Sequence, residues 1–410
     1  MNRVAVTGLG VLSSIGDSPQ SFFASLLGGI SGVAYLREAF LYDTVPRLAS
    51  AVAFEPLAHF KKSQLIGLDR FSQFGVVAAR QAWEGAQMDR AIYSPERVGV
   101  CWGTGLGGAV TIEDGYHQEF YLRTGRVKPY SVFMTMCNAA SAHISLQYRL
   151  QGPTLTYSVA CASSTIAIGE AFRLIRHGYA NAMVAGGSEA FLTYGSFKAW
   201  EGLRALAIPD PQDPRASCKP FDRRRSGLVL GEGAAAVLLE DYAQATARGA
   251  PILAELVGYG LSSDAAHITA PDKTGQAIAM RAALADASLD PRDIQHINAH
   301  GTATLIGDKT ETEAIKEVFG DHARALMISA TKSMHGHVMG ATGAVEFVAT
   351  VMAVEQQVVP PTAHLVEPDP ECDLDYVPLV ARKNTNISCA MSNSFAFGGS
   401  NAVLVIKKPT

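Results

Sequence analysis

The sequence is organised around residues 158–178, which read SVACASSTIAIGEAFRLIRHG. A β-type run from Thr154 to Val159 precedes Cys161, and apolar residues then recur at helical spacing until Gly178. This pattern predicts a strand, a tight turn that carries the cysteine, and a helix. A thiol at the amino end of a helix lies near the positive end of the helix dipole, which favours the thiolate. These residues alone fit a nucleophile and a buried core cysteine equally well, because free cysteine is among the most buried residue types.

The composition is that of a large, well-packed globular enzyme. A chain of 410 residues is too long for one ordinary core, which indicates two domains or a duplicated one. Its residues are 48% hydrophobic and 18% charged, as expected for a well-buried globular protein. A net charge of −4 gives no sign of nucleic-acid binding. No apolar run approaches the about 18 residues of a membrane span, and no signal peptide is evident, so we expect a cytoplasmic protein. The six cysteines lack C-x-x-C spacing, so neither a disulfide framework nor a zinc knuckle is indicated.

Predicted strands and helices alternate along the whole chain, which favours a layered α/β fold with largely parallel sheets. A strand at residues 4–7 is expected to end in a glycine turn at Gly8-Leu9-Gly10. Asp308 and Glu311 have the spacing of a capping box and predict a helix start. The chain is expected to divide into halves at 1–249 and 250–410, although no repeat is visible in the letters. Helices are expected at residues 69–86, 139–150, 275–287, 308–319 and 344–355.

Residues 103–108 read GTGLGG and follow a predicted strand, which is the pattern of a dinucleotide-binding turn. The pattern is weak here. The next acidic residues, Glu113 and Asp114, come too soon to contact a ribose, and no second strand lies between.

Two histidines lie in turns of the second half. The stretch NAHGTAT at residues 298–304 places His300 at the end of a strand, and two threonines follow it. The stretch KSMHGH at residues 332–337 places His337 in a glycine-containing loop, just before the predicted helix that carries Glu346. Either histidine alone is more often a satisfied core or surface residue.

Together, Cys161, His300 and His337 suit acyl transfer. A thiolate takes an acyl group as a thioester and so splits one difficult transfer into two easier steps. Two neutral imidazoles can donate hydrogen bonds to a thioester carbonyl as negative charge builds on it, which the decarboxylation of a malonyl thioester requires. With His335, the same residues also make a zinc site conceivable. We expect no metal, because no carboxylate or paired thiol at helical spacing completes such a site.

Four motifs in this order resemble the elongating β-ketoacyl-[acyl-carrier-protein] synthases of type II fatty acid synthesis. The motifs are VACASS at 159–164, NAHGTAT at 298–304, KSMHGH at 332–337 and NSFAFGGSN at 393–401. The resemblance runs from Val4 to Ile406, and the set is specific although each motif alone is not. It implies a thiolase-like fold, in which two similar α/β halves form a five-layered αβαβα core.

The resemblance also implies roles for residues of this sequence. It identifies Cys161 as the acylated nucleophile, His300 and His337 as the decarboxylation and condensation histidines, and Lys332 and Glu346 as a supporting charged pair. It further implies that Thr302 and Thr304 meet the phosphopantetheine arm, that Phe397 with Phe395 gates the site, that Leu106 ends the acyl pocket, and that Lys61, Lys62, Arg126 and Arg204 dock the carrier protein.

The sequence departs from the family pattern in several places. Ala396 stands before the gating phenylalanine where glycine is usual, and His335 replaces a common threonine and adds a titratable group near His337. Residues 63–68 lack the usual basic side chains of the docking patch. The side chains of Phe133, Met134 and Met136, near the expected acyl pocket, are bulkier or softer than usual.

The expected reaction is the condensation of an acyl primer with malonyl-acyl carrier protein, without a cofactor beyond the phosphopantetheine of the carrier. The expected partners are acyl carrier protein and a second copy of the chain, and neither nucleic acid nor membrane. An alternative is a ketosynthase of a polyketide or polyene pathway, paired with a chain-length factor. Cys161 argues against a non-catalytic chain-length factor, and the SCAM context of Cys389 argues against a thiolase.

Overall fold

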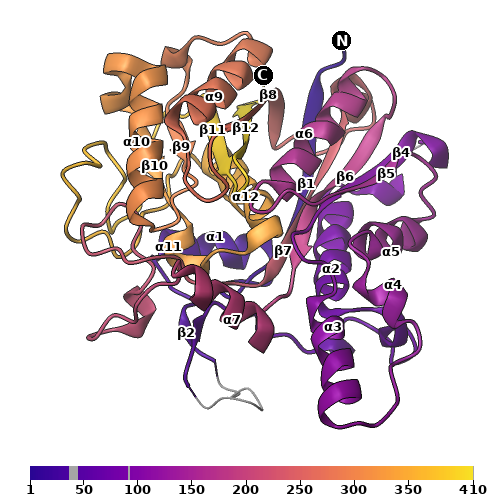
Figure 1. Cartoon of the computed structure of the whole chain (residues 1–410). Helices are drawn as coiled ribbons and strands as arrows, with labels where there is room; N and C mark the ends of the chain where they lie inside the picture. Colours follow the sequence, from indigo (N-terminus) through magenta and orange to yellow (C-terminus); the bar gives the residue numbers. More distant parts are fainter. Residues whose placement is uncertain (37–44, 91–92, 410) are drawn as a thin grey trace.

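The computed structural model describes residues 1–36, 45–90 and 93–409 (Figure 1). Ten strands form one sheet, in the order β10-β9-β11-β12-β8-β1-β7-β6-β4-β5. Their bounds are β1 (Val4–Leu12), β4 (Val98–Gly103), β5 (Thr154–Tyr157), β6 (Ala182–Glu189), β7 (Gly233–Asp241), β8 (Ala254–Ser263), β9 (His296–Asn298), β10 (Met327–Ser329), β11 (Cys389–Phe395) and β12 (Ser400–Lys407).

The two halves of the sheet repeat one topology. From β1 outward the pairs are antiparallel to β7, antiparallel to β6, parallel to β4 and parallel to β5. From β8 outward the same four senses recur through β12, β11, β9 and β10. The structure therefore shows a duplication that is not visible in the amino-acid sequence. The prediction of largely parallel sheets was wrong, because β7 and β12 each lie antiparallel to both of their neighbouring strands.

One half of the sheet consists of β1, β7, β6, β4 and β5, and the other of β8, β12, β11, β9 and β10. Helices cover the outer face of each half-sheet and also lie between the two half-sheets (Figure 1). On the outside, α2 packs on β1, β7 and β6 with α5 beside it, and α9 packs on β8 and β12 with α10 beside it. Between the half-sheets, α6 and α12 contact each other. This is the expected five-layered αβαβα core. The helix bounds are α2 (Arg70–Gly85), α5 (Ala139–Tyr148), α6 (Ser163–Arg176), α9 (Lys273–Ala287), α10 (Leu305–Phe319) and α12 (Thr342–Gln356).

The glycines near the amino terminus lie inside a strand and do not form a turn. Strand β1 continues through them to Leu12. A Cβ atom on Gly8 would lie 2.0 Å from the carbonyl oxygen of Ala82, and one on Gly10 would lie 1.9 Å from that of Ala78. The predicted turn was wrong because these glycines let α2 approach the strand closely.

Helix α10 begins three residues before the predicted start. Its N-cap is Thr304, whose hydroxyl accepts the N–H of Gly307 at 3.2 Å. Asp308 is buried within the helix, where it accepts the N–H groups of Phe221 at 2.8 Å and Ala303 at 3.1 Å. The capping-box prediction was therefore wrong. Asp308 and Glu311 are buried carboxylates that accept backbone N–H groups from neighbouring loops.

The predicted division between residues 249 and 250 falls in the connection from α8 (Tyr242–Ala247) to β8. Within the described residues, no helix is both long enough and apolar enough to span a membrane.

Candidate active site

The turn that carries Cys161 is held in a strained form. The predicted order of strand, turn and helix is present: β5 ends at Tyr157, two residues before the predicted end, and α6 begins at Ser163. Ala160 has a φ of +43°, a left-handed conformation that costs a non-glycine residue about 1–3 kcal/mol. The Ser163 hydroxyl offsets part of this cost, since it accepts the N–H of Val159 at 2.8 Å and donates to the carbonyl oxygen of Ala160 at 2.6 Å. The strain fixes where the sulfur lies.

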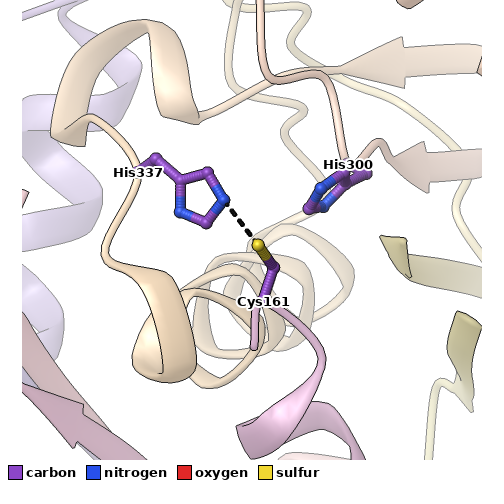
Figure 2. Close-up of side chains that lie close together, drawn as sticks. All are labelled: Cys161, His300 and His337. Atoms are coloured by element: carbon purple, nitrogen blue, oxygen red, sulfur yellow. Dashed lines mark hydrogen bonds between the residues drawn. The ribbon is translucent and has the colours of Figure 1, made fainter. Parts of the chain in front are cut away.

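His337 lies against the sulfur of Cys161. It follows α11 (Lys332–His335), and its Nε2 is 3.0 Å from Sγ (Figure 2). Its Nδ1 accepts the backbone N–H of Met339 at 2.9 Å and the hydroxyl of Thr342 at 3.1 Å. Because a backbone N–H can only donate, the neutral ring carries its proton on Nε2. His337 therefore directs an N–H donor at the reactive position.

His300 presents a second donor from the other side of the sulfur (Figure 2). Its ring centroid is 5.8 Å from that of His337, and the ring planes are nearly perpendicular. The ammonium of Lys332 lies 3.4 Å from His300 Nδ1. It also donates to the carbonyl oxygen of His300 and, at 2.6 Å, to Glu346 Oε1. An ammonium has no lone pair, so Nδ1 is the acceptor and the Nε2 of His300 carries the proton.

Glu311 supports this histidine in a way that the sequence reasoning missed. Its buried carboxylate accepts the N–H groups of His300 and Gly301, each at 2.8 Å, and the side-chain amide of Asn393 at 3.2 Å. The available signal was its position on the same face of α10 as the buried residues Ala314 and Ile315. An acidic residue on an apolar helix face has to find donors inside the protein.

The imidazoles of His300 and His337 both stay neutral at physiological pH. Burial lowers the pKa of His300 and of His337 well below the usual histidine range, and the ammonium of Lys332 lowers it further. Burial also lowers the pKa of His335 to about 3. His335 donates from Nδ1 to its neighbour's carbonyl at 2.8 Å and accepts the Thr331 hydroxyl at 3.0 Å. The expectation that His335 adds a titratable group near His337 was therefore wrong.

The Cys161 thiol is protonated in the free protein. Burial raises its pKa to about 11, while the ammonium of Lys332 and the backbone N–H of Phe397 act in the opposite direction. The sequence-based expectation of a thiolate at the start of α6 was wrong, because burial penalises the charged form of the sulfur. Attack by the sulfur therefore requires proton loss when substrate binds.

Alkylation of Cys161 tests this balance. Below the pKa, the thiolate fraction rises tenfold for each pH unit. We expect the rate of iodoacetamide labelling at Cys161 to rise about tenfold per unit from pH 7 to pH 10, as followed by intact-protein mass spectrometry. A labelling rate that reaches a plateau below pH 8 would show that the helix dipole lowers the pKa of Cys161 more than burial raises it.

A cavity of about 360 Å³ links these groups to the surface. Its lining includes Cys161, His300, His337, Thr302, Thr304, Arg204, Phe395 and Phe397. The two threonine hydroxyls lie 3.0 Å apart. Trp200, from α7 (Tyr194–Leu203), also lines the cavity and stacks on Phe397 with ring centroids 5.9 Å apart.

Other predicted site residues lie outside this cavity lining. The side chain of Leu106 is 43% exposed, and Phe133 and Met136 are also exposed, whereas Met134 is buried. Lys61, Lys62 and Arg126 are exposed on the surface. Their assigned roles stay predictions.

The donor set is a poor one for a metal ion. The nearest ligand atoms of Cys161, His300 and His337 lie within 4.8 Å of one another, so geometry alone would allow a metal. A metal on either Nε2 would displace its proton, while Nδ1 still faces the Met339 N–H in one ring and the Lys332 ammonium in the other. Such a ring would have to be an imidazolate, so the hydrogen bonds favour two N–H donors instead.

Comparison with known proteins shows the family of this chain. The family model of the β-ketoacyl synthase N-terminal domain matches residues 1–245, and that of the C-terminal domain matches residues 253–366. The chain is 42% identical to 3-oxoacyl-[acyl-carrier-protein] synthase 2 of Staphylococcus aureus (strain COL), over 99% of this chain and 98% of the relative. It is 43% identical to nodulation protein E of Rhizobium leguminosarum bv. trifolii, over 99% of both chains.

A solved structure agrees with these relatives. The ishigamide ketosynthase/chain length factor superposes with a TM-score of 0.92 at 35% identity, and the match covers all of both chains. With the family models matched along both halves of the duplicated fold, the chain belongs to the β-ketoacyl synthase family.

Proposed function

We propose that this chain elongates an acyl chain by decarboxylative condensation with malonyl-acyl carrier protein. The observation that carries the proposal is the pair of neutral Nε2–H donors, from His300 and His337, on either side of the Cys161 sulfur in one cavity. A thiol nucleophile accounts for acyl transfer, and paired donors account for a carbonyl that becomes an enolate.

The first half-reaction loads the protein. The sulfur of Cys161 attacks the thioester carbonyl of the primer, and the carrier thiol leaves with the proton. The backbone N–H of Phe397, which contacts the sulfur, is placed to donate a hydrogen bond to the negatively charged oxygen of the tetrahedral intermediate. The product is an acyl group held as a thioester on Cys161.

The second half-reaction builds the new carbon–carbon bond. The thioester carbonyl of the malonyl group accepts hydrogen bonds from His300 and His337. The bond to its carboxylate breaks, CO₂ leaves, and the electron pair forms an enolate. The enolate carbon attacks the acyl group on Cys161, the carbon–sulfur bond breaks, and a β-ketoacyl-carrier protein is released. Lys332 holds His300 in the required tautomer and is itself neutralised by Glu346. No free cofactor is needed in this scheme.

Product analysis tests the proposal. The protein is incubated with malonyl-acyl carrier protein and a panel of acyl primers, and products are identified by mass spectrometry. We expect one CO₂ released for each two-carbon extension. Primer that is transferred without extension, or no reaction across the panel, would contradict the proposal.

A ketosynthase of a polyketide or polyene pathway is the second candidate, and the similarity to the ishigamide ketosynthase/chain length factor favours it. The same assay separates the two functions. Repeated additions without intervening reduction indicate a polyketide enzyme, whereas single extensions of saturated primers indicate fatty acid synthesis.

We propose that a second subunit, either a copy of this chain or a chain-length factor homologue, covers an apolar surface between residues 106 and 136. Large apolar side chains are exposed there although apolar residues are usually buried. They are Leu106, Ile112, Tyr116, Phe120, Tyr121, Leu122, Val127, Tyr130, Val132, Phe133 and Met136.

We also propose that acyl carrier protein docks at the exposed cations Lys61, Lys62, Arg126 and Arg204, of which Arg204 lies at the cavity. The cytoplasmic location stays a prediction.

The role of Leu106 can be tested with a primer series. An apolar pocket gains about 0.8 kcal/mol per buried CH₂ until a wall is reached, and rejection beyond the wall is steep. If Leu106 is that wall, Leu106→Gly should lengthen the longest accepted primer. Ala396→Gly, next to the gate, should instead raise turnover at all lengths without moving the limit. An unchanged limit in Leu106→Gly would show that Leu106 only packs against its surroundings.

A further inference from the structure

Glu189 is a buried carboxylate to which the proposed reaction gives no role. It is the last residue of β6 and is fully buried. Its Oε2 accepts the N–H groups of Gly105 at 2.5 Å and Gly340 at 3.0 Å. Its Oε1 accepts the N–H of Leu106 at 3.0 Å and the hydroxyl of Thr104 at 3.2 Å. All four donors are neutral, and no salt bridge among the described residues includes Glu189.

The donors come from two loops that belong to different halves of the fold. Residues 104–107 form the turn after β4, and residues 337–342 form the loop that carries His337. The loops pack closely, because a Cβ atom on Gly340 would lie 2.3 Å from the backbone nitrogen of Gly105. The glycine-rich stretch that resembled a phosphate-binding turn thus directs its N–H groups at a carboxylate of its own chain.

The second loop is also the one that orients His337. The N–H of Met339 is the donor that fixes His337 Nδ1, and the next residue, Gly340, is held by Glu189. A shift of Gly340 would therefore move the Met339 N–H and rotate the imidazole. A displacement of about 1 Å in a catalytic group can cost about 100-fold in rate.

We propose that Glu189 is a positioning residue that aims the Nε2–H of His337 at the thioester carbonyl, by clamping the loop at residues 337–342 to the turn at residues 104–107. The inference rests on the proposed function of His337. The Cys161 turn makes none of the four hydrogen bonds, although Ser158 donates to the carbonyl oxygen of Gly105 at 3.1 Å, so the expected effect is larger on decarboxylation than on acyl transfer. Burial raises the pKa of the Glu189 carboxyl to about 7, so the clamp is best measured at pH 8, where the carboxylate predominates.

Three variants of the whole protein test the clamp. Glu189→Ala removes all four bonds. Glu189→Gln keeps one carbonyl oxygen, which can still accept from Gly105 and Gly340 while its amide group donates to the Thr104 hydroxyl. Thr104→Val removes the hydroxyl that donates to Glu189 Oε1 and accepts the N–H of Gly107 at 3.2 Å, but leaves the bonds of the carboxylate to Gly105, Leu106 and Gly340. It serves as the matched control for a disturbance of the same buried site. Each variant is measured for thermal unfolding, for malonyl decarboxylation (kcat and KM), and for acyl transfer to Cys161.

We expect Glu189→Ala to lower the kcat of decarboxylation by about 10- to 100-fold, with acyl transfer within about threefold of wild type and an unchanged KM for malonyl-carrier protein. Glu189→Gln should restore the kcat to about 3- to 10-fold below wild type, and Thr104→Val should keep both half-reactions within about threefold.

Equal losses in both half-reactions, or a wild-type kcat in Glu189→Ala, would overturn the positioning role. If Glu189→Ala does not fold, Glu189→Gln decides, and a wild-type kcat of decarboxylation in that variant would overturn the role. A wild-type protein that does not decarboxylate malonyl-carrier protein would overturn the proposed function and, with it, this inference.

Discussion

Cys161→Ala is expected to abolish condensation, with a loss of at least about 10⁴-fold, because Cys161 is the one thiol among the described residues that line the cavity. Malonyl decarboxylation should persist in this variant, since the hydrogen-bond donors of His300 and His337 are unchanged. The fold should be intact, because the substitution removes one sulfur atom from a buried position. The measurement is condensation and decarboxylation side by side, with thermal unfolding as the check on folding.

Cys101→Ala is the matched control for this experiment. Cys101 is also fully buried, but it lies in β4 and away from the cavity lining. It should condense at a rate close to that of wild type. Condensation by Cys161→Ala at a rate near that of the control would contradict the role of the thiol.

His300→Ala and His337→Ala should each lower the rate of malonyl decarboxylation by about 10²- to 10³-fold, the usual cost of losing one oxyanion donor. Each ring donates one hydrogen bond to the enolate oxygen, so neither can replace the other. Acylation of Cys161 should fall less, because that step does not generate an enolate. The two half-reactions are followed separately, by CO₂ release and by the mass of the acylated protein.

His335→Ala is the control for the histidine variants. Its ring is buried two residues from His337, but it bonds to Thr331 and to a backbone carbonyl and not to the sulfur. Decarboxylation by this variant should stay within about tenfold of wild type, in keeping with an indirect effect. Equal losses of acylation and decarboxylation in His300→Ala and His337→Ala would refute the division of labour between thiol and imidazoles.

The sequence was sufficient to predict the parts of the site that depend on local pattern. The turn before α6 and the histidines after β9 and α11 follow from strand, turn and helix signals in short stretches. The three residues meet because the duplicated halves place α6 and α12 side by side in the middle layer. That meeting depends on pairing between distant strands, which one sequence does not reveal, and it was inferred from the family resemblance.

Burial caused most of the errors. Gly8 and Gly10 read as a turn because the approach of α2 cannot be seen in the letters. The thiol of Cys161 read as a thiolate because the helix start is visible in the sequence and the loss of solvent is not. Glu311 was interpreted as part of a capping box and Glu189 was not singled out, yet both accept backbone N–H groups brought from other segments by the fold.

The central claim is that the growing chain is held covalently on Cys161. The most direct measurement is mass spectrometry of peptides from the wild-type protein. The protein is first incubated with carrier protein that is loaded with an acyl primer, in the absence of a malonyl donor. The account predicts one acyl group, as a thioester, on the peptide that contains Cys161, and its disappearance when malonyl-carrier protein is added. An acyl group on another residue, or condensation without any acylated peptide, would contradict it.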